Sequence, residues 1–167
     1  MSVPVGGGPS VTLASPAFEA PRQIAIDATK VYWTTGSGKV RTAPLGGGAS
    51  TTLDSGSSSG DSFVAVAATT LYWANRGGGS VRKVPLDGTP PTALASGQSL
   101  PTGIAVDGTS VYWTNGSGAI GTVMRAPLGG GAPAVLASGQ HIPQAIAVDA
   151  TSVYWTTFGG TVMKVAK

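Results

Sequence analysis

The chain has 167 residues, only 10% of them charged, and its net charge of +3 is spread over ten basic and seven acidic side chains. Lys and Arg form no cluster in the sequence, so we expect neither a nucleic-acid nor a membrane partner, because both call for such clusters. The lack of cysteine excludes disulfides and cysteine-based metal sites, and the length suits one solid domain over residues 1–167.

The first segment, residues 1–18, lacks the basic and apolar regions of a secretory signal. No apolar run in the chain approaches the ~20 residues of a membrane-spanning helix. The cellular compartment is therefore left open. Within this segment, residues 3–15 align without a gap on residues 126–138, and they are therefore predicted to be one end of a repeat.

A single pattern then occurs four times, and each copy carries a Tyr-Trp pair. The spacings between the tryptophans are 40, 40 and 42 residues. Self-similarity at this period predicts stacked supersecondary units. The pairs are Tyr32-Trp33, Tyr72-Trp73, Tyr112-Trp113 and Tyr154-Trp155. The predicted repeats are approximately 21–60, 61–100, 101–142, and 143–167 completed by 1–20.

Each unit is predicted to contain four short strands, which in the first repeat are residues 23–27, 31–35, 40–45 and 51–53. The second strand is rich in β-branched and aromatic residues, which favour a half-buried pleated surface. The fourth is short, as suits an edge strand. Because no window has a useful helical period, the chain is predicted to be all-β.

Adjacent Tyr and Trp side chains on a strand point to opposite faces of the sheet. Both faces of each unit must therefore be covered. Four-stranded units of about 40 residues that are apolar on both faces are typical of β-propeller blades. The sequence therefore predicts a propeller of four-stranded antiparallel blades, four blades to the chain.

Two stretches of the third repeat carry a family resemblance: Pro101-x-x-Ile104-Ala105-Val106-Asp107 and Val111-Tyr112-Trp113-Thr114. They resemble the YWTD propeller repeat and, more loosely, the NHL repeat, and the resemblance extends over essentially the whole chain. One departure concerns the aspartate that ends the YWTD signature. Its place is taken by Thr35, Asn75, Asn115 and Thr157.

The resemblance implies rings that usually have six blades, whereas this chain supplies four. An open arc would leave two apolar blade faces in water, more than a soluble monomer tolerates. We favour a homodimer in which pairing of the N- and C-terminal strands closes two chains into an eight-bladed ring. The alternative is a four-bladed monomer closed by the same pairing within one chain.

Three aspartates recur in the turn between the first two strands: Asp27, Asp107 and Asp149. A ring of carboxylates could hold a cation, but a hard-cation site needs six to eight converging oxygens, and Ala67 takes the place of the fourth aspartate. We interpret the three as turn caps. No metal or other cofactor is expected.

Propeller ligands usually bind at loops that vary between blades. The loop residues expected to form such a site are Arg22, Asn75, Arg76, Asn115, Gln140 and His141. His141 is the chain's one histidine, and no nucleophile or orienting carboxylate stands near it in the sequence. No catalytic residue is therefore expected.

The sequence favours a non-catalytic propeller module that acts as a scaffold or as an interaction and ligand-binding domain, natural, engineered or part of a larger propeller. One alternative is a calcium-dependent, lactonase-like hydrolase, although such sites need crowded acids and the chain has a single glutamate, Glu19. The other is a carbohydrate-binding lectin. The four tryptophans, placed at strand centres, are predicted to lie in the core and not to stack on sugars.

Overall fold

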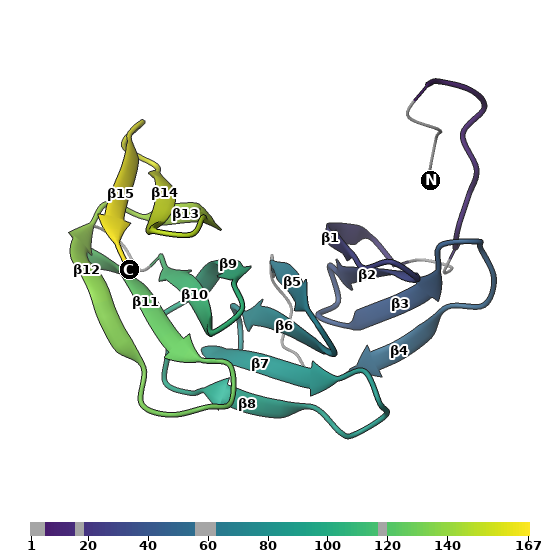
Figure 1. Ribbon diagram of the computed structural model, residues 1–167, viewed down its shortest axis with the longest axis horizontal. Helices are drawn as coiled ribbons and strands as arrows, with labels where there is room; N and C mark the ends of the chain where they lie inside the picture. Colours follow the sequence, from purple (N-terminus) through teal and green to yellow (C-terminus); the bar gives the residue numbers. More distant parts are fainter. Residues whose placement is uncertain (1–5, 16–18, 56–62, 117–119) are drawn as a thin grey trace.

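The computed structural model describes residues 6–15, 19–55, 63–116 and 120–167. Four antiparallel β-sheets follow one another around an arc, and their innermost strands lie side by side on its concave side (Figure 1). The predicted all-β propeller architecture is confirmed. Among the described residues, no helix has the length and apolar character needed to cross a membrane.

Each sheet is one blade, with its strands in chain order from the inside of the arc outward. The first blade contains β1 (Pro21–Ile26), β2 (Lys30–Thr35), β3 (Val40–Pro44) and β4 (Thr51–Asp54). The second contains β5 (Val64–Ala67), β6 (Thr70–Asn75), β7 (Ser80–Pro85) and β8 (Thr92–Ala95). The third contains β9 (Pro101–Val106), β10 (Ser110–Asn115), β11 (Gly121–Pro127) and β12 (Ala134–Gln140). The fourth contains three strands, β13 (Pro143–Val148), β14 (Ser152–Thr157) and β15 (Val162–Ala166).

The core lies between the blades, and the Tyr-Trp pairs build it as the sequence predicts. Trp113 of the third blade packs with Tyr72 of the second, while Tyr112 packs with Trp155 of the fourth. At each internal junction the tryptophan therefore faces the preceding blade and the tyrosine the following one. Because burying one large side chain stabilises by about 1.5–3 kcal/mol, these junctions hold most of the fold's apolar stabilisation.

The turn between the first two strands of a blade is held by its aspartate. Oδ1 of Asp27 accepts the backbone N–H groups of Thr29 at 2.7 Å and Lys30 at 2.8 Å, and Oδ2 accepts the hydroxyl of Tyr32 at 2.6 Å. The hydrogen bond from Tyr32, followed by the one from Thr29, holds the pKa of Asp27 well below its usual range. The same pattern recurs around Asp107 and Asp149. All three aspartates are therefore turn caps that also anchor the tyrosine.

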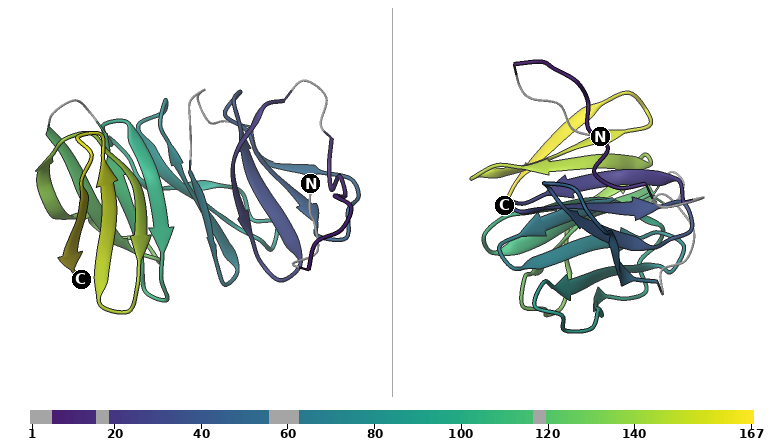
Figure 2. Two further views of the ribbon diagram at one scale, coloured as in Figure 1. Left: turned by 90° about the horizontal axis from the view of Figure 1, so that it is seen from above. Right: turned by 90° about the vertical axis from the view of Figure 1, so that its right-hand side faces the viewer.

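Among the residues that the structure describes, the predicted pairing between the two ends of the chain is not formed. Residues 6–15 contain no assigned strand, and β15 lies at the edge of its sheet. The first and fourth blades lie at opposite ends of the arc (Figures 1 and 2). Leu13 and Ala14 pack instead against Trp33, on the face of the first blade that points away from the second. Four blades of this curvature do not bring the last sheet back to the first.

Candidate functional site

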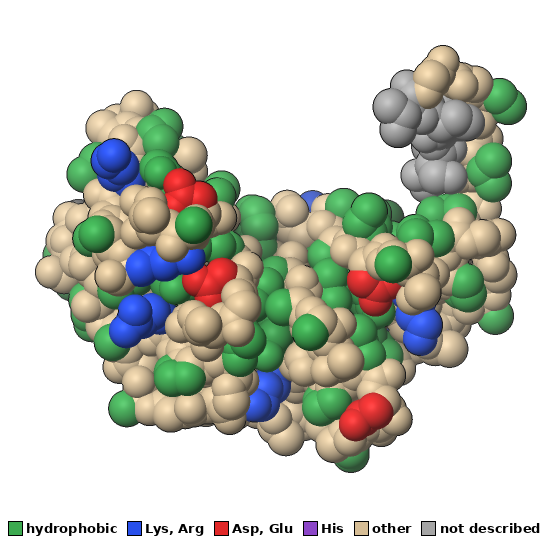
Figure 3. Space-filling model, in the orientation of Figure 1, with side chains coloured by type: hydrophobic (Ala, Val, Ile, Leu, Met, Phe, Trp, Pro, Cys, Tyr) green, Lys and Arg blue, Asp and Glu red, His purple; other side chains and the backbone are tan. Residues whose placement is uncertain are grey.

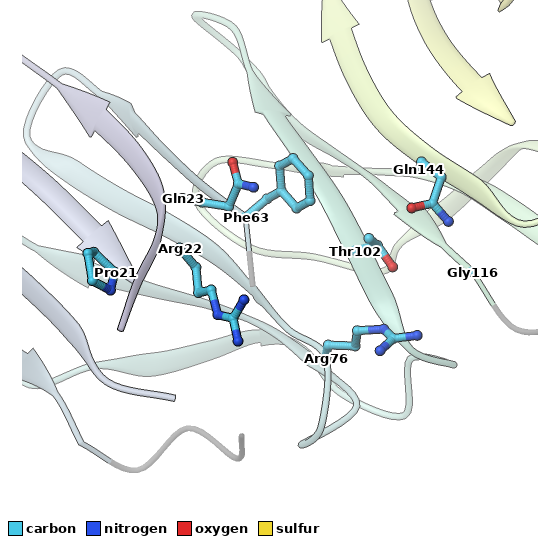
Figure 4. A pocket seen from close by; sticks show the side chains of 8 residues that line it. All are labelled: Pro21, Arg22, Gln23, Phe63, Arg76, Thr102, Gly116 and Gln144. Carbon is cyan, nitrogen blue, oxygen red and sulfur yellow. The ribbon is translucent and has the colours of Figure 1, made fainter. Parts of the chain in front are cut away.

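A hollow of about 520 Å³ opens where the inner strands meet, and all four blades contribute to its lining. β1 contributes three residues, and β9 and β13 contribute one each. One more comes from the segment before β5, and the loops after β6 and β10 supply one each. The lining residues are drawn in Figure 4: Pro21, Arg22, Gln23, Phe63, Arg76, Thr102, Gly116 and Gln144.

Part of the lining arises from one repeat position, the residue that follows the proline at the start of an inner strand. These residues are Arg22 after Pro21, Thr102 after Pro101 and Gln144 after Pro143. The counterpart in the second blade, Ser62, lies outside the described residues. Variation between the loops of different blades, which predicts the other site residues, does not single out Gln23, Thr102 or Gln144. One signal points to them, because in the first, third and fourth repeats a Pro-x-x-Ile frame holds two residues that vary.

Arg22 and Arg76 give the hollow its charge. They come from neighbouring blades, and no acidic residue is among the described residues that line the hollow. Both lie on the same side of the group of side chains in Figure 4. The side chain of Arg22 lies against Gly36, where an added Cβ would stand 3.5 Å from the arginine Nε, an ordinary contact distance. Two guanidinium groups on one rim make it suited to an anionic group.

Neutral polar groups complete the lining. The hydroxyl of Thr102 donates to the carbonyl of Leu100 at 3.0 Å, and the carbonyl of Gln144 accepts the hydroxyl of Thr114 at 2.7 Å. These bonds fix the backbone of β9 and β13 at the hollow. The side-chain amides of Gln23 and Gln144 supply donors and acceptors that can orient a ligand.

The single glutamate is engaged away from the hollow. The carboxylate of Glu19 accepts Nζ of Lys39 at 2.6 Å and Nη1 of Arg41 at 2.9 Å, and its side chain is largely buried. The hydrogen bond from Lys39, followed by the one from Arg41, lowers the pKa of Glu19. Its charge is therefore already neutralised by two cations within the first blade.

Asn75 and Asn115 are buried and hold the loops that follow β6 and β10. The side-chain oxygen of Asn75 accepts the backbone N–H of Gly78 at 3.3 Å. The side-chain amide of Asn115 donates to Oε1 of Gln98 at 3.0 Å and to the hydroxyl of Thr122 at 3.1 Å. Neither asparagine lines the hollow, so neither belongs to the site proposed below.

Gln140 holds a junction between blades. Its Oε1 accepts the indole N–H of Trp155 at 3.0 Å, just as Oε1 of Gln98 accepts that of Trp113 at 2.9 Å. Both glutamines end a Ser-Gly-Gln sequence, just after β8 for Gln98 and at the end of β12 for Gln140, and this repeated triplet indicates their role.

His141 also lies apart from the hollow lining. Its ring is exposed and stands 6.4 Å from the ring of Phe158. Across the ranges that the structure describes, no group of three or more His, Cys, Asp or Glu side chains could hold a metal ion. Of the six loop residues expected at the site, the structure brings Arg22 and Arg76 together and places the other four elsewhere.

The tryptophans lie in the core, as predicted from their position in the strands. Trp73 and Trp113 have no exposed surface, and Trp33 and Trp155 expose 6% and 3%. Buried indoles cannot stack on a sugar, so a carbohydrate site would need other aromatic groups.

No protein-family model matches the sequence, and a search of curated proteins gives no match either. Solved structures do match. A chain in the crystal structure of a nidogen/laminin complex has 23% identity and a TM-score of 0.78 over 89% of this chain. This chain spans 61% of that one, less than two thirds of its length. The likeness fits a YWTD-like propeller and, at this identity, shows the fold alone.

Two computationally designed proteins share the fold as well. The designed Ika4 protein has 18% identity and a TM-score of 0.77, and the match covers 94% of this chain and 98% of Ika4. The designed Ika8 protein has 18% identity and a TM-score of 0.73, and the match covers 89% of this chain and 46% of Ika8. The four blades therefore correspond to nearly all of one designed chain and to about half of the other.

Proposed function

We propose that the chain is a non-catalytic binding propeller whose central hollow takes an anionic group of its ligand. The observation that carries the proposal is the pair Arg22 and Arg76, two guanidinium groups that line one hollow from two neighbouring blades. The other two blades add the neutral polar side chains of Thr102 and Gln144. The site therefore offers charge on one side and orienting hydrogen bonds on the other.

Arginine suits this role because its planar guanidinium donates two parallel hydrogen bonds to a carboxylate, sulfate or phosphate. A hydrogen bond to a charged group contributes about 1.5–3 kcal/mol. Loss of one arginine should therefore weaken binding roughly 10-fold or more. The hollow opens to water, so added salt should weaken binding as well.

A binding role without catalysis is supported by what the hollow offers chemically. General acid–base chemistry needs a group that exchanges a proton near neutral pH, positioned at the substrate. The described lining contains arginines, amides, one hydroxyl and apolar groups. These side chains bind and orient but do not exchange protons near pH 7.

Calorimetric titration with citrate tests the proposal, with glucose as the neutral probe. Citrate should bind and glucose should not, and Arg76→Gln should weaken citrate binding at least 10-fold. Arg125→Gln is the matched control, because it removes the same charge from β11 without touching the hollow lining. Equal citrate affinity in wild type, Arg76→Gln and Arg125→Gln would refute the site.

The hydrolase and lectin alternatives remain predictions from the sequence, and two additional titrations separate them from the proposed role. Heat on addition of Ca²⁺ would favour the lactonase-like hydrolase, because that class needs a central calcium. Binding of neutral glycans with no dependence on Arg76 would favour the lectin.

A further inference from the structure

The two end faces of the arc expose side chains whose counterparts are buried or half-buried at the internal junctions. Ile24 on the first blade is 66% exposed, whereas its counterpart Ile104 on the third blade is 6% exposed. Val162 on the fourth blade is 76% exposed, whereas its counterpart Val123 is fully buried. The same repeat positions therefore lack a neighbouring blade at the two ends of the arc.

At each internal junction these two positions belong to one hydrophobic core. A valine near the start of the third strand of one blade packs in the same cluster as the aliphatic residue in the inner strand of the next. The three pairs are Val40 with Val64, Val81 with Ile104, and Val123 with Ile146. Val162 and Ile24 occupy these same two positions on the open end faces. Each therefore offers the apolar contact that the other lacks.

The N-terminal segment adds a second match. Leu136 and Ala137, in the outer strand of the third blade, pack into the cluster that contains Trp155 of the fourth. Leu13 and Ala14 pack on Trp33 of the first blade in the same way. These two residues therefore lie where the outer strand of a preceding blade would lie, although no such blade is present.

The sheet that is missing beside the first blade has the features of a fourth blade from another copy of the chain. In the second and third blades the third strand pairs with an outer strand, with Val81 opposite Ala95 and Val123 opposite Ala137. In the fourth blade, within the described ranges, β15 pairs with β14 alone and lies at the sheet edge. Residues 11–15, held on the first blade, have the sequence of the outer strand that this edge lacks.

We propose that two copies of this chain close into one ring, each donating residues 11–15 as the outer strand of the other's fourth blade. Ala14 of the partner subunit then stands opposite Val162, and Ile24 of the partner subunit packs over it. One two-fold axis satisfies both contacts, so no apolar blade face or strand edge is left open.

A second copy fits better than self-closure because of where the matching surfaces lie. The end face that carries Ile24 belongs to the first blade, and the end face that carries Val162 belongs to the fourth. The two blades lie at opposite ends of the arc (Figures 1 and 2). On the broad face of the arc drawn in Figure 3, Lys and Arg side chains lie mostly toward the fourth-blade side, with Asp and Glu side chains among them. The assembly rests on these surfaces alone and is independent of anion binding in the hollow.

A cysteine pair tests the proposed register, because the chain contains no cysteine of its own. The double variant Ala14→Cys with Val162→Cys should give, after mild oxidation, a covalent species of twice the 16.4 kDa chain mass. The matched control Val123→Cys with Ala137→Cys places the pair at an observed internal register and should cross-link within one chain. A 16.4 kDa cross-linked product from the Ala14/Val162 pair would overturn the proposal in favour of the closed monomer.

A second test uses charges and the mass in solution by light scattering. Ile24→Lys and Val162→Asp should each reduce the wild-type two-chain mass to one chain. An equimolar mixture should regain two chains, because one contact is then unmodified and the other joins Lys to Asp. The control Val135→Asp changes an exposed strand residue of β12 and should stay dimeric. A wild type with the mass of one chain, or an open series of higher masses, overturns the closed dimer.

Discussion

The third and fourth blades carry nearly the same sequence but occupy different surroundings. In the third blade Tyr112, Thr114 and Val123 are buried by the fourth blade that follows. In the fourth blade the corresponding Thr156 and Val162 are exposed. The residue type is thus set by the repeat, whereas burial is set by the neighbour, as expected for an array stabilised at its nearest-neighbour interfaces.

Polar contacts differ between junctions in the same way. At the junction of the second and third blades, Oε1 of Gln98 accepts both the indole of Trp113 and the amide of Asn115. At the next junction, the corresponding glutamine, Gln140, accepts the indole of Trp155. A repeated residue therefore carries a different number of hydrogen bonds at each junction.

The largest expected effect comes from placing a charge at one repeat position in two blades. Val123→Asp buries a carboxylate with no partner and should lower the free energy of unfolding by about 3–5 kcal/mol. Val162→Asp leaves its carboxylate in water on the isolated chain, so the loss there should stay below about 1 kcal/mol. Urea denaturation measures both, with dilute samples so that chain association does not contribute. Equal losses would mean that the two positions share one environment.

Gly103 tests how closely the third and fourth blades approach. A Cβ at this position would collide with the backbone carbonyl of Gln144 and stand 3.1 Å from the hydroxyl of Thr114. Gly103→Ala should cost about 1–3 kcal/mol, at the upper end because the nearest atom is backbone and cannot swing away. Gly108→Ala is the control, since nothing lies within 4 Å of its added Cβ. A thermal melt that shows no difference between the two variants would contradict the close approach of β9 to β13.

The glutamines give a smaller effect. Gln98→Ala leaves the indole of Trp113 and the amide of Asn115 without their acceptor, whereas Gln140→Ala affects the indole of Trp155 alone. An unpaired buried donor costs about 1–3 kcal/mol, and the half-buried position of Gln98 lets water reduce that cost. We therefore expect a loss near 1 kcal/mol for Gln98→Ala and a smaller one for Gln140→Ala. The reverse order in urea denaturation would show that the second bond to Asn115 contributes nothing.

The architecture could be predicted from the sequence because it depends on local patterns. The alternation around Tyr112 and Trp113 sets the two faces of a strand, and its return every 40 or 42 residues sets the blade. The strands observed in the first blade begin and end within two residues of the predicted ones. These features need no knowledge of which residues distant in the chain meet.

The hollow could be predicted only in part because it depends on how the blades converge. Loop variation predicts Arg22 and Arg76. Arg22 nevertheless lies in β1, at the same strand position as Thr102 and Gln144, which the loop argument does not include. Asn75 and Asn115 have the composition of a binding loop and yet are buried in capping bonds. Hydrogen bonding of that kind is decided by a few tenths of a nanometre, which residue types alone do not specify.

The smallest expected effect compares the turn at Asp149 with the second-blade turn, where Ala67 takes the place of the acid. The backbone N–H groups of Thr151 and Ser152 donate to the Asp149 carboxylate and lower its pKa from 3.8 to about 2. Because the folded-state pKa is depressed, this stabilisation is fully present above about pH 4 and is lost as the pH falls through 2. A carboxyl-carbon NMR titration measures the pKa directly. Asp149→Asn should flatten the fall in unfolding free energy between pH 4 and pH 2, since an amide does not titrate there. A measured pKa near 4 would show that the turn bonds do not favour the charged form, and the aspartate would then contribute no more to its turn than alanine does in the second blade.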